Sequence, residues 1–122
     1  MKPVIAIATL LLPLSLQAGS PTTFVPARFI GDWAASPQSC GSGTDDLALR
    51  ITSNRIRYWE SEGSIKAVVV RGNADIALIT ELSGEGETWL ATATFKLSQD
   101  GRKLVDVTTV PGREIARYKC PK

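Results

Sequence analysis

The feature that most constrains the fold is an alternation of apolar and polar residues with period two, which begins at Leu47 and continues toward the C-terminus. Turn-forming pairs such as Ser-Asn, Gly-Asn and Asp-Gly interrupt it about every ten residues, the spacing typical of short strands joined by tight turns. A helix would instead repeat its apolar residues every three or four positions. The sequence therefore predicts an all-β meander.

The lengths of the turns predict which side chains share a face, because a slip of one residue moves every side chain to the other side of the sheet. A two-residue Ser-Asn turn pairs Ile51 with Ile56. Three further turns extend this apolar face over five strands. They lie at 62–63, 72–73 and 83–86, and they pair Tyr58 with Ala67, Ile56 with Val69, Val69 with Ile76, Ala67 with Leu78, Ile65 with Thr80, and Thr80 with Trp89.

The turn at 98–101 allows two registers. A four-residue loop would bury Asp106 opposite Ala93, whereas a three-residue loop with glycine in the left-handed conformation pairs Phe95 with Val105. The second register is preferred, because it leaves no carboxylate buried without a partner. It places Val105, Ala116 and Tyr118 inside, and Asp106 and Arg117 outside.

A strand over residues 29–35 precedes the meander and brings the number of antiparallel strands to about eight, at which a sheet can close into a small barrel. The interior of such a barrel is filled by side chains or holds one small ligand. The predicted fold is a small up-and-down antiparallel barrel. An open sandwich of the same strands is the alternative.

Residues 1–18 have the pattern of a secretory signal peptide. One lysine precedes an apolar run at 4–16, and a small residue, Ala18, follows it. Cleavage there would leave an extended segment at 19–28 and a single barrel domain at 29–122. The protein is therefore expected to be periplasmic or secreted.

Composition argues against several functions. Without Lys2 of the signal peptide, the chain has thirteen basic and twelve acidic residues. Because this net charge is close to zero, we expect no nucleic acid partner and no stable membrane insertion. The chain has no histidine, which removes histidine-dependent triads, imidazole bases and the usual zinc sites. Glu60 and Glu62 flank a predicted turn and should be solvated. We expect no enzymatic activity, no cofactor and no metal.

The two cysteines, Cys40 and Cys120, most simply form one disulfide in an exported protein. In an eight-strand meander, the loop after the first strand and the end of the last strand lie at opposite ends of the barrel. Either the loop at 36–46 folds back along the wall, or the strand count is wrong by one.

Gly31-x-Trp33, at the start of the first strand, resembles the Gly-x-Trp motif of lipocalins, whose tryptophan packs across one end of the barrel. The resemblance implies a lipocalin-like barrel with Gly31 and Trp33 as its end plug. A second resemblance involves Pro26, Phe29, Gly31-x-Trp33, Cys40, Tyr58-x-Glu60-Ser61, Gly84-Glu85-Gly86, Trp89, Leu97-Ser98, Asp100-Gly101 and Tyr118-x-Cys120. Through these residues the chain is similar to a family of small exported proteobacterial proteins, which implies export and a disulfide but no activity.

One outer face of the meander is the first candidate for function. Arg50 and Arg57 should lie directly opposite each other, which is unfavourable unless an anionic group lies between them. Arg55 should lie close by, and Trp59 should face Lys66. The apolar residues that extend this face are Val68, Val70, Ile79 and Leu90. Because tryptophan and arginine are enriched at binding hot spots, we expect a non-catalytic module that engages the acidic surface of a cell-envelope protein, as an inhibitor or accessory factor.

Two alternatives remain open. The N-terminal segment at 24–29 could fold over the outer face and cover it. The interior could instead carry a small apolar ligand, because Ala91 and Ala93 would leave room between larger side chains. The residues that would contact such a ligand are Tyr58, Glu60 and Trp89. Of these, Glu60 would lie either in the interior or at the rim, in contact with water.

Overall fold

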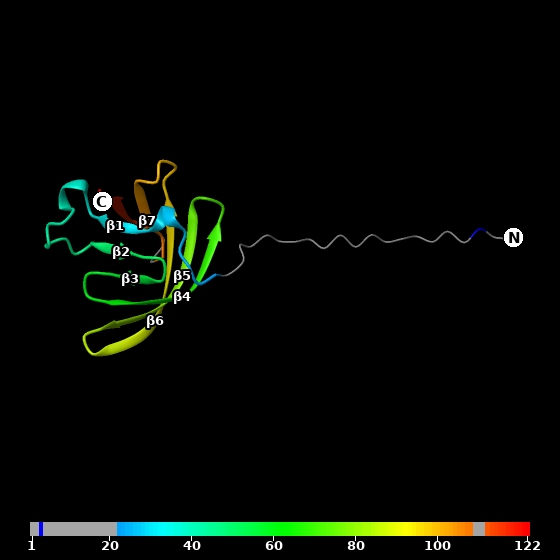
Figure 1. Ribbon diagram of the computed structural model, residues 1–122, viewed down its shortest axis with the longest axis horizontal. Helices are drawn as coiled ribbons and strands as arrows, with labels where there is room; N and C mark the ends of the chain where they lie inside the picture. Colours follow the sequence, from blue (N-terminus) through cyan, green and yellow to red (C-terminus); the bar gives the residue numbers. More distant parts are fainter. Residues whose placement is uncertain (1–2, 4–21, 109–111) are drawn as a thin grey trace.

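The computed structural model describes residues 3, 22–108 and 112–122, so the predicted signal peptide, Pro3 apart, lies outside the described residues. Eight antiparallel strands form a closed barrel in which sequence neighbours pair and β1 pairs with β8 (Figure 1). This confirms the predicted all-β class, the count of eight strands and the closure. The strands are β1 (Gly31–Ala34), β2 (Leu49–Ile51), β3 (Arg55–Arg57), β4 (Glu62–Arg71), β5 (Asp75–Gly84), β6 (Glu87–Leu97), β7 (Lys103–Asp106) and β8 (Ile115–Lys119). Two short 3₁₀ helices, η1 (Ala27–Phe29) and η2 (Pro37–Ser39), flank β1.

The segment that precedes β1 closes one end of the barrel. Thr22 exchanges two backbone hydrogen bonds with Val68 of β4, and the Val25 amide donates a third into the β2–β3 turn. Phe29 and Trp33 are fully buried, and the indole Nε1 of Trp33 donates to the Phe29 carbonyl at 3.1 Å. The segment therefore packs into the barrel end rather than over the outer face, and Trp33 lies where an end plug is expected.

The turn between β3 and β4 is closed by a 2.7 Å hydrogen bond from the Tyr58 amide to the Ser61 carbonyl. The predicted turn at Glu62-Gly63 is wrong, because Gly63 is paired within β4. A Cβ on Gly63 would lie 1.6 Å from the carbonyl oxygen of Glu81, so glycine is required for the close approach of β4 to β5. The predicted pairs of Tyr58 with Ala67 and of Ile56 with Val69 are consequently wrong, whereas Ile51 with Ile56 is confirmed.

A β-bulge in β4 changes which residues face inward. Ile65 lies opposite Thr80, as predicted, but one extra residue then shifts the register so that Val68 lies opposite Leu78. Val68 is fully buried and Val70 packs against the core, although both are predicted to face outward. The predicted pairs of Ala67 with Leu78 and of Val69 with Ile76 are therefore wrong.

A two-residue turn joins β5 to β6. Glu85 and Gly86 have φ angles of 50° and 79°, the left-handed values of the hairpin turns that match the twist of paired strands. The predicted four-residue loop is therefore wrong. Trp89 lies opposite Leu82 instead of Thr80, which places it nearer the rim of the barrel, where its side chain is exposed.

The register between β6 and β7 differs from the preferred prediction. Phe95 lies opposite Asp106, and Asp106 and Arg117 of β8 both point into the barrel, with only 8% and 5% of their surfaces exposed. Burial of the carboxylate is tolerable because Thr108 donates hydrogen bonds to it and Arg117 lies beside it. The predicted inward positions of Val105, Ala116 and Tyr118 are wrong, as are the outward positions of Asp106 and Arg117.

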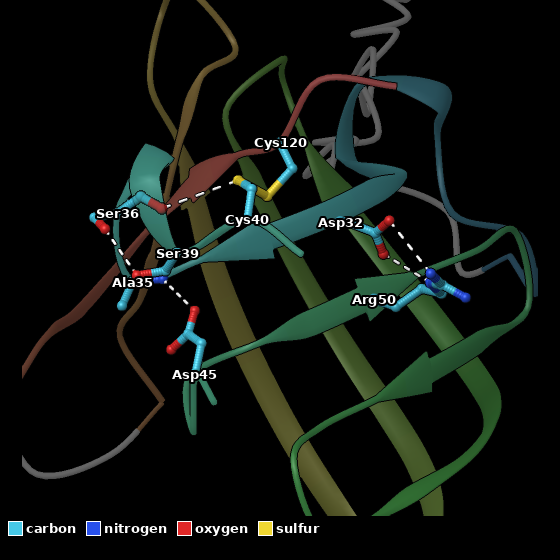
Figure 2. The surroundings of a disulfide bond; sticks show 8 residues. All are labelled: Asp32, Ala35, Ser36, Ser39, Cys40, Asp45, Arg50 and Cys120. Atoms are coloured by element: carbon cyan, nitrogen blue, oxygen red, sulfur yellow. Dashed lines mark hydrogen bonds and ion pairs between the residues drawn. A yellow bond between two sulfur atoms is a disulfide. The ribbon is translucent and has the colours of Figure 1, made fainter. Parts of the chain in front are cut away.

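Cys40 and Cys120 form the predicted disulfide (Figure 2). The Cys120 amide donates to the Asp32 carbonyl at 2.8 Å, so the end of the chain runs beside β1. Asp45 fixes the returning loop, because its two carboxylate oxygens accept hydrogen bonds from the amides of Ala35 and Leu47. Of the two alternatives, the folded-back loop is correct, and the strand count stands.

Candidate functional site

A cavity of about 620 Å³, which we call the mouth cavity, opens at the end of the barrel opposite η1. The β1–β2 loop and the β3–β4 and β5–β6 turns gather at this end, on the left of Figure 1. Its apolar lining is Leu82, Ala91 and Ala93 from β5 and β6, and Tyr58 and Trp59 come from the β3–β4 turn. The polar lining includes Asp46, Glu60, Asp106 and Thr108.

Two small residues of β6 leave the space that the cavity occupies. Ala91 lies opposite Thr80, and Ala93 lies opposite Leu78, all with side chains on the inner face of the barrel. In a closely packed interior, a larger side chain at either alanine would occupy the cavity. The volume of the cavity therefore depends on these two positions.

An ion pair between Asp106 and Arg117 lies at the base of the mouth cavity. Asp106 Oδ1 accepts hydrogen bonds from the amide and hydroxyl of Thr108, and Oδ2 is 3.7 Å from Arg117 Nη1, too far for a hydrogen bond. Arg117 Nε donates to the Leu47 carbonyl at 2.6 Å. Nη1 is buried and has no hydrogen-bond partner among the described residues, so the pair is incompletely satisfied.

Burial shifts the titration of two groups around this base. Burial lowers the pKa of Arg117, and the nearby Asp106 carboxylate opposes the shift. Burial also raises the pKa of Tyr58 to about 12, with a further contribution from Asp106. At neutral pH the phenol is therefore neutral.

A second hollow, of about 520 Å³, lies outside the barrel beside the disulfide, and we call it the disulfide groove. The loop at 39–43 forms one side, and Arg50, Arg57 and Trp59 belong to the other. Tyr58 and Trp59 line both hollows. The β3–β4 turn therefore separates the mouth cavity from the disulfide groove.

The predicted opposition of Arg50 and Arg57 is present, but its consequence differs from the prediction. The carboxylate of Asp32 lies 2.7 Å from the Nε of Arg50 (Figure 2). This hydrogen bond and charge raise the pKa of Arg50. Because Asp32 already offsets the charge of Arg50, the two arginines do not require an external anion between them.

The other residues predicted on the outer face are more dispersed than expected. Trp59 lies in the β3–β4 turn, so its predicted position opposite Lys66 of β4 is wrong. Arg55 lies opposite Ser64 and does not line the disulfide groove. The apolar residues that remain exposed on the outer face are Ile79 and Leu90.

Of the residues predicted to contact an internal ligand, Tyr58 and Glu60 line the mouth cavity and Trp89 does not. Glu60 is exposed at the rim. Asp106 and Arg117 were not predicted as site residues, although the rejected four-residue loop would have buried Asp106. Their opposite charges on neighbouring strands were the available signal for a buried pair.

No group of three or more His, Cys, Asp or Glu side chains suited to a metal ion occurs among residues 22–108 and 112–122. Over the same part of the chain, no helix combines the length and apolar character needed to cross a membrane. Comparison of the chain with protein-family models, curated proteins and solved structures finds no match.

Proposed function

We propose that the protein binds a small organic molecule in the mouth cavity. The observation that carries this proposal is the incompletely satisfied ion pair of Asp106 and Arg117, of which Asp106 lines the open mouth cavity. A buried ion pair is weak support for stability, because desolvation of the two charges offsets much of their attraction. A few polar groups in an otherwise apolar pocket are, by contrast, the usual means of orienting a ligand.

The size and walls of the mouth cavity suit such a ligand. Its volume of about 620 Å³ falls within the range of roughly 300 to 1,000 Å³ common for small-molecule sites. Leu82, Ala91 and Ala93 offer apolar contacts, while Tyr58 and Trp59 offer aromatic surface. An amphipathic molecule would use both the apolar walls and the polar base.

Filling the cavity should weaken binding. Ala91→Phe would place a phenyl ring in the mouth cavity, whereas Ala77→Phe would place the same ring on the outer face of β5, opposite Val69. In an NMR screen of small amphiphiles, we expect amide shifts around Ala93 and Asp106 in the wild type and the Ala77→Phe control. Ala91→Phe should lower the affinity about tenfold or more, equivalent to about 1.4 kcal/mol. Binding that survives Ala91→Phe would contradict the proposal.

We propose engagement of a cell-envelope protein, as an inhibitor or accessory factor, as a second function, supported by the disulfide groove. Arg57 and Trp59 line this groove, and binding energy concentrates on such residues. Arg57→Glu should therefore lose the partner in a pull-down from an envelope fraction. The matched control, Arg55→Glu, reverses a charge outside the groove and should retain the partner. Equal recovery by both variants would argue against this second function.

A further inference from the structure

We infer that the molecule bound in the mouth cavity is an organic cation, with an ammonium head group and an apolar body. This inference rests on the proposed function. The first observation is charge, because Asp46, Glu60 and Asp106 contribute to the lining, and none of the described lining residues is a lysine or an arginine. The negative charge of the cavity therefore stabilises a cation that enters it and destabilises an anion.

Arg117 does not cancel this preference. Its Nη1 is buried, lies 3.7 Å from Asp106 Oδ2, and does not belong to the lining of the cavity. The guanidinium therefore offsets part of the negative charge of Asp106 but cannot make a direct contact with an entering anion. Asp46 and Glu60 are exposed, and they add negative charge where the cavity opens.

The second and independent observation is an unused acceptor on a buried side chain. Asp106 is only 8% exposed, yet it contributes to the lining of the cavity. The amide and the hydroxyl of Thr108 donate to Oδ1, while Oδ2 accepts no hydrogen bond from any described residue. Oδ2 is not among the described buried side-chain atoms that lack a partner, so it keeps some accessible surface and an entering donor can reach it. An ammonium N–H would supply the missing donor as a charge-assisted hydrogen bond.

Aromatic side chains provide the third element of a cation site. Tyr58 and Trp59 line the same cavity, and the faces of such rings attract ammonium groups. Tyr58 keeps its proton at neutral pH, because burial raises its pKa to about 12. The apolar body of the ligand would lie against Leu82 and Ala91, which offer no polar side-chain atoms.

Three probes that share an octyl chain and differ in head group test this inference: octylammonium, 1-octanol and octyl sulfate. We expect octylammonium to bind the wild-type protein at least about tenfold more tightly than 1-octanol, as one charge-assisted hydrogen bond would cause. Octyl sulfate should bind most weakly. Isothermal titration calorimetry at concentrations below micelle formation gives the affinities, and NMR shifts around Asp106 locate the site.

Two carboxylate variants with the same change of charge provide the control. Glu60→Gln at the rim of the cavity should weaken octylammonium binding about two- to fivefold, the range expected for a solvent-exposed charge contact. It should leave 1-octanol binding unchanged. Glu81→Gln alters an exposed carboxylate on the outer face of β5 and should change neither. Asp106→Asn should remove the preference for the cation if the variant folds, and Glu60→Gln decides if it does not.

The outcomes separate the two proposals. If 1-octanol or octyl sulfate binds as tightly as octylammonium in the mouth cavity, the inference of a cation is overturned and the proposed function stands. If none of the three probes binds, both are overturned. Preferential binding of octylammonium that is lost in Ala91→Phe supports both.

Discussion

Replacement of both cysteines, by Cys40→Ser together with Cys120→Ser, is expected to lower the free energy of unfolding by about 4 to 5 kcal/mol. The disulfide joins residues separated by 80 positions, and removing it frees a long loop in the unfolded chain. The native barrel also depends on it, because the seam between β1 and β8 has two paired positions, Trp33 with Lys119 and Ala34 with Tyr118. Urea unfolding followed by tryptophan fluorescence measures the loss.

Reduction of the wild-type protein serves as the control for this variant. A reducing agent should lower the stability by a similar amount, while the double serine variant should be insensitive to it. A loss below about 1 kcal/mol in both cases would show that the strand pairs alone hold the seam closed, against the expectation from loop-closure entropy.

Replacement of Arg117 by methionine should be the second large effect, with a loss of about 3 to 5 kcal/mol of stability. The variant leaves Asp106 buried without its cation, and it also removes the hydrogen bond from Nε to the Leu47 carbonyl. Adding Asp106→Leu should restore most of the loss, because an apolar pair can replace a buried ion pair. Thermal and urea unfolding of the single and double variants give the coupling between the two side chains.

The exposed ion pair of Arg50 and Asp32 offers a matched comparison. More than half of each side chain is exposed to solvent, so Arg50→Met should change the stability little. If Arg117→Met proves as mild as Arg50→Met, water reaches Asp106 in the folded protein. The ion pair would then not be the buried base of the mouth cavity.

The strand count could be predicted because it depends on local turn signals, and the disulfide could be predicted because the chain has only two cysteines. The pair of Ile51 with Ile56 follows from a short turn between alternating residues. The bulge in β4 could not be predicted, because residues 67–70 read Ala-Val-Val-Val and are apolar on both faces. Either register buries valines, so alternation does not select one.

The base of the candidate site was missed for a different physical reason. Each charged residue was assigned to water because burying it by itself is unfavourable. Burial of Asp106 and Arg117 is tolerable only when the two side chains pair with each other. The pair could be foreseen only from the register of β7 and β8, and that register was itself predicted by keeping single charges outside. Tyr58 and Glu60 were identified because they lie near a turn at the open end, where a register error moves them little.

The disulfide makes a covalent ring of the residues from Cys40 to Cys120, which include β2 to β8. An exposed turn such as residues 72–74 is a preferred place for a protease to nick the backbone. One nick there leaves both pieces attached through the sulfur bridge. Phe29 and Trp33 lie outside the ring, however, so a single cut between Trp33 and Cys40 would separate the end plug from the rest of the molecule. Resistance to proteolysis therefore depends on how well the folded barrel protects the short segment between Trp33 and Cys40.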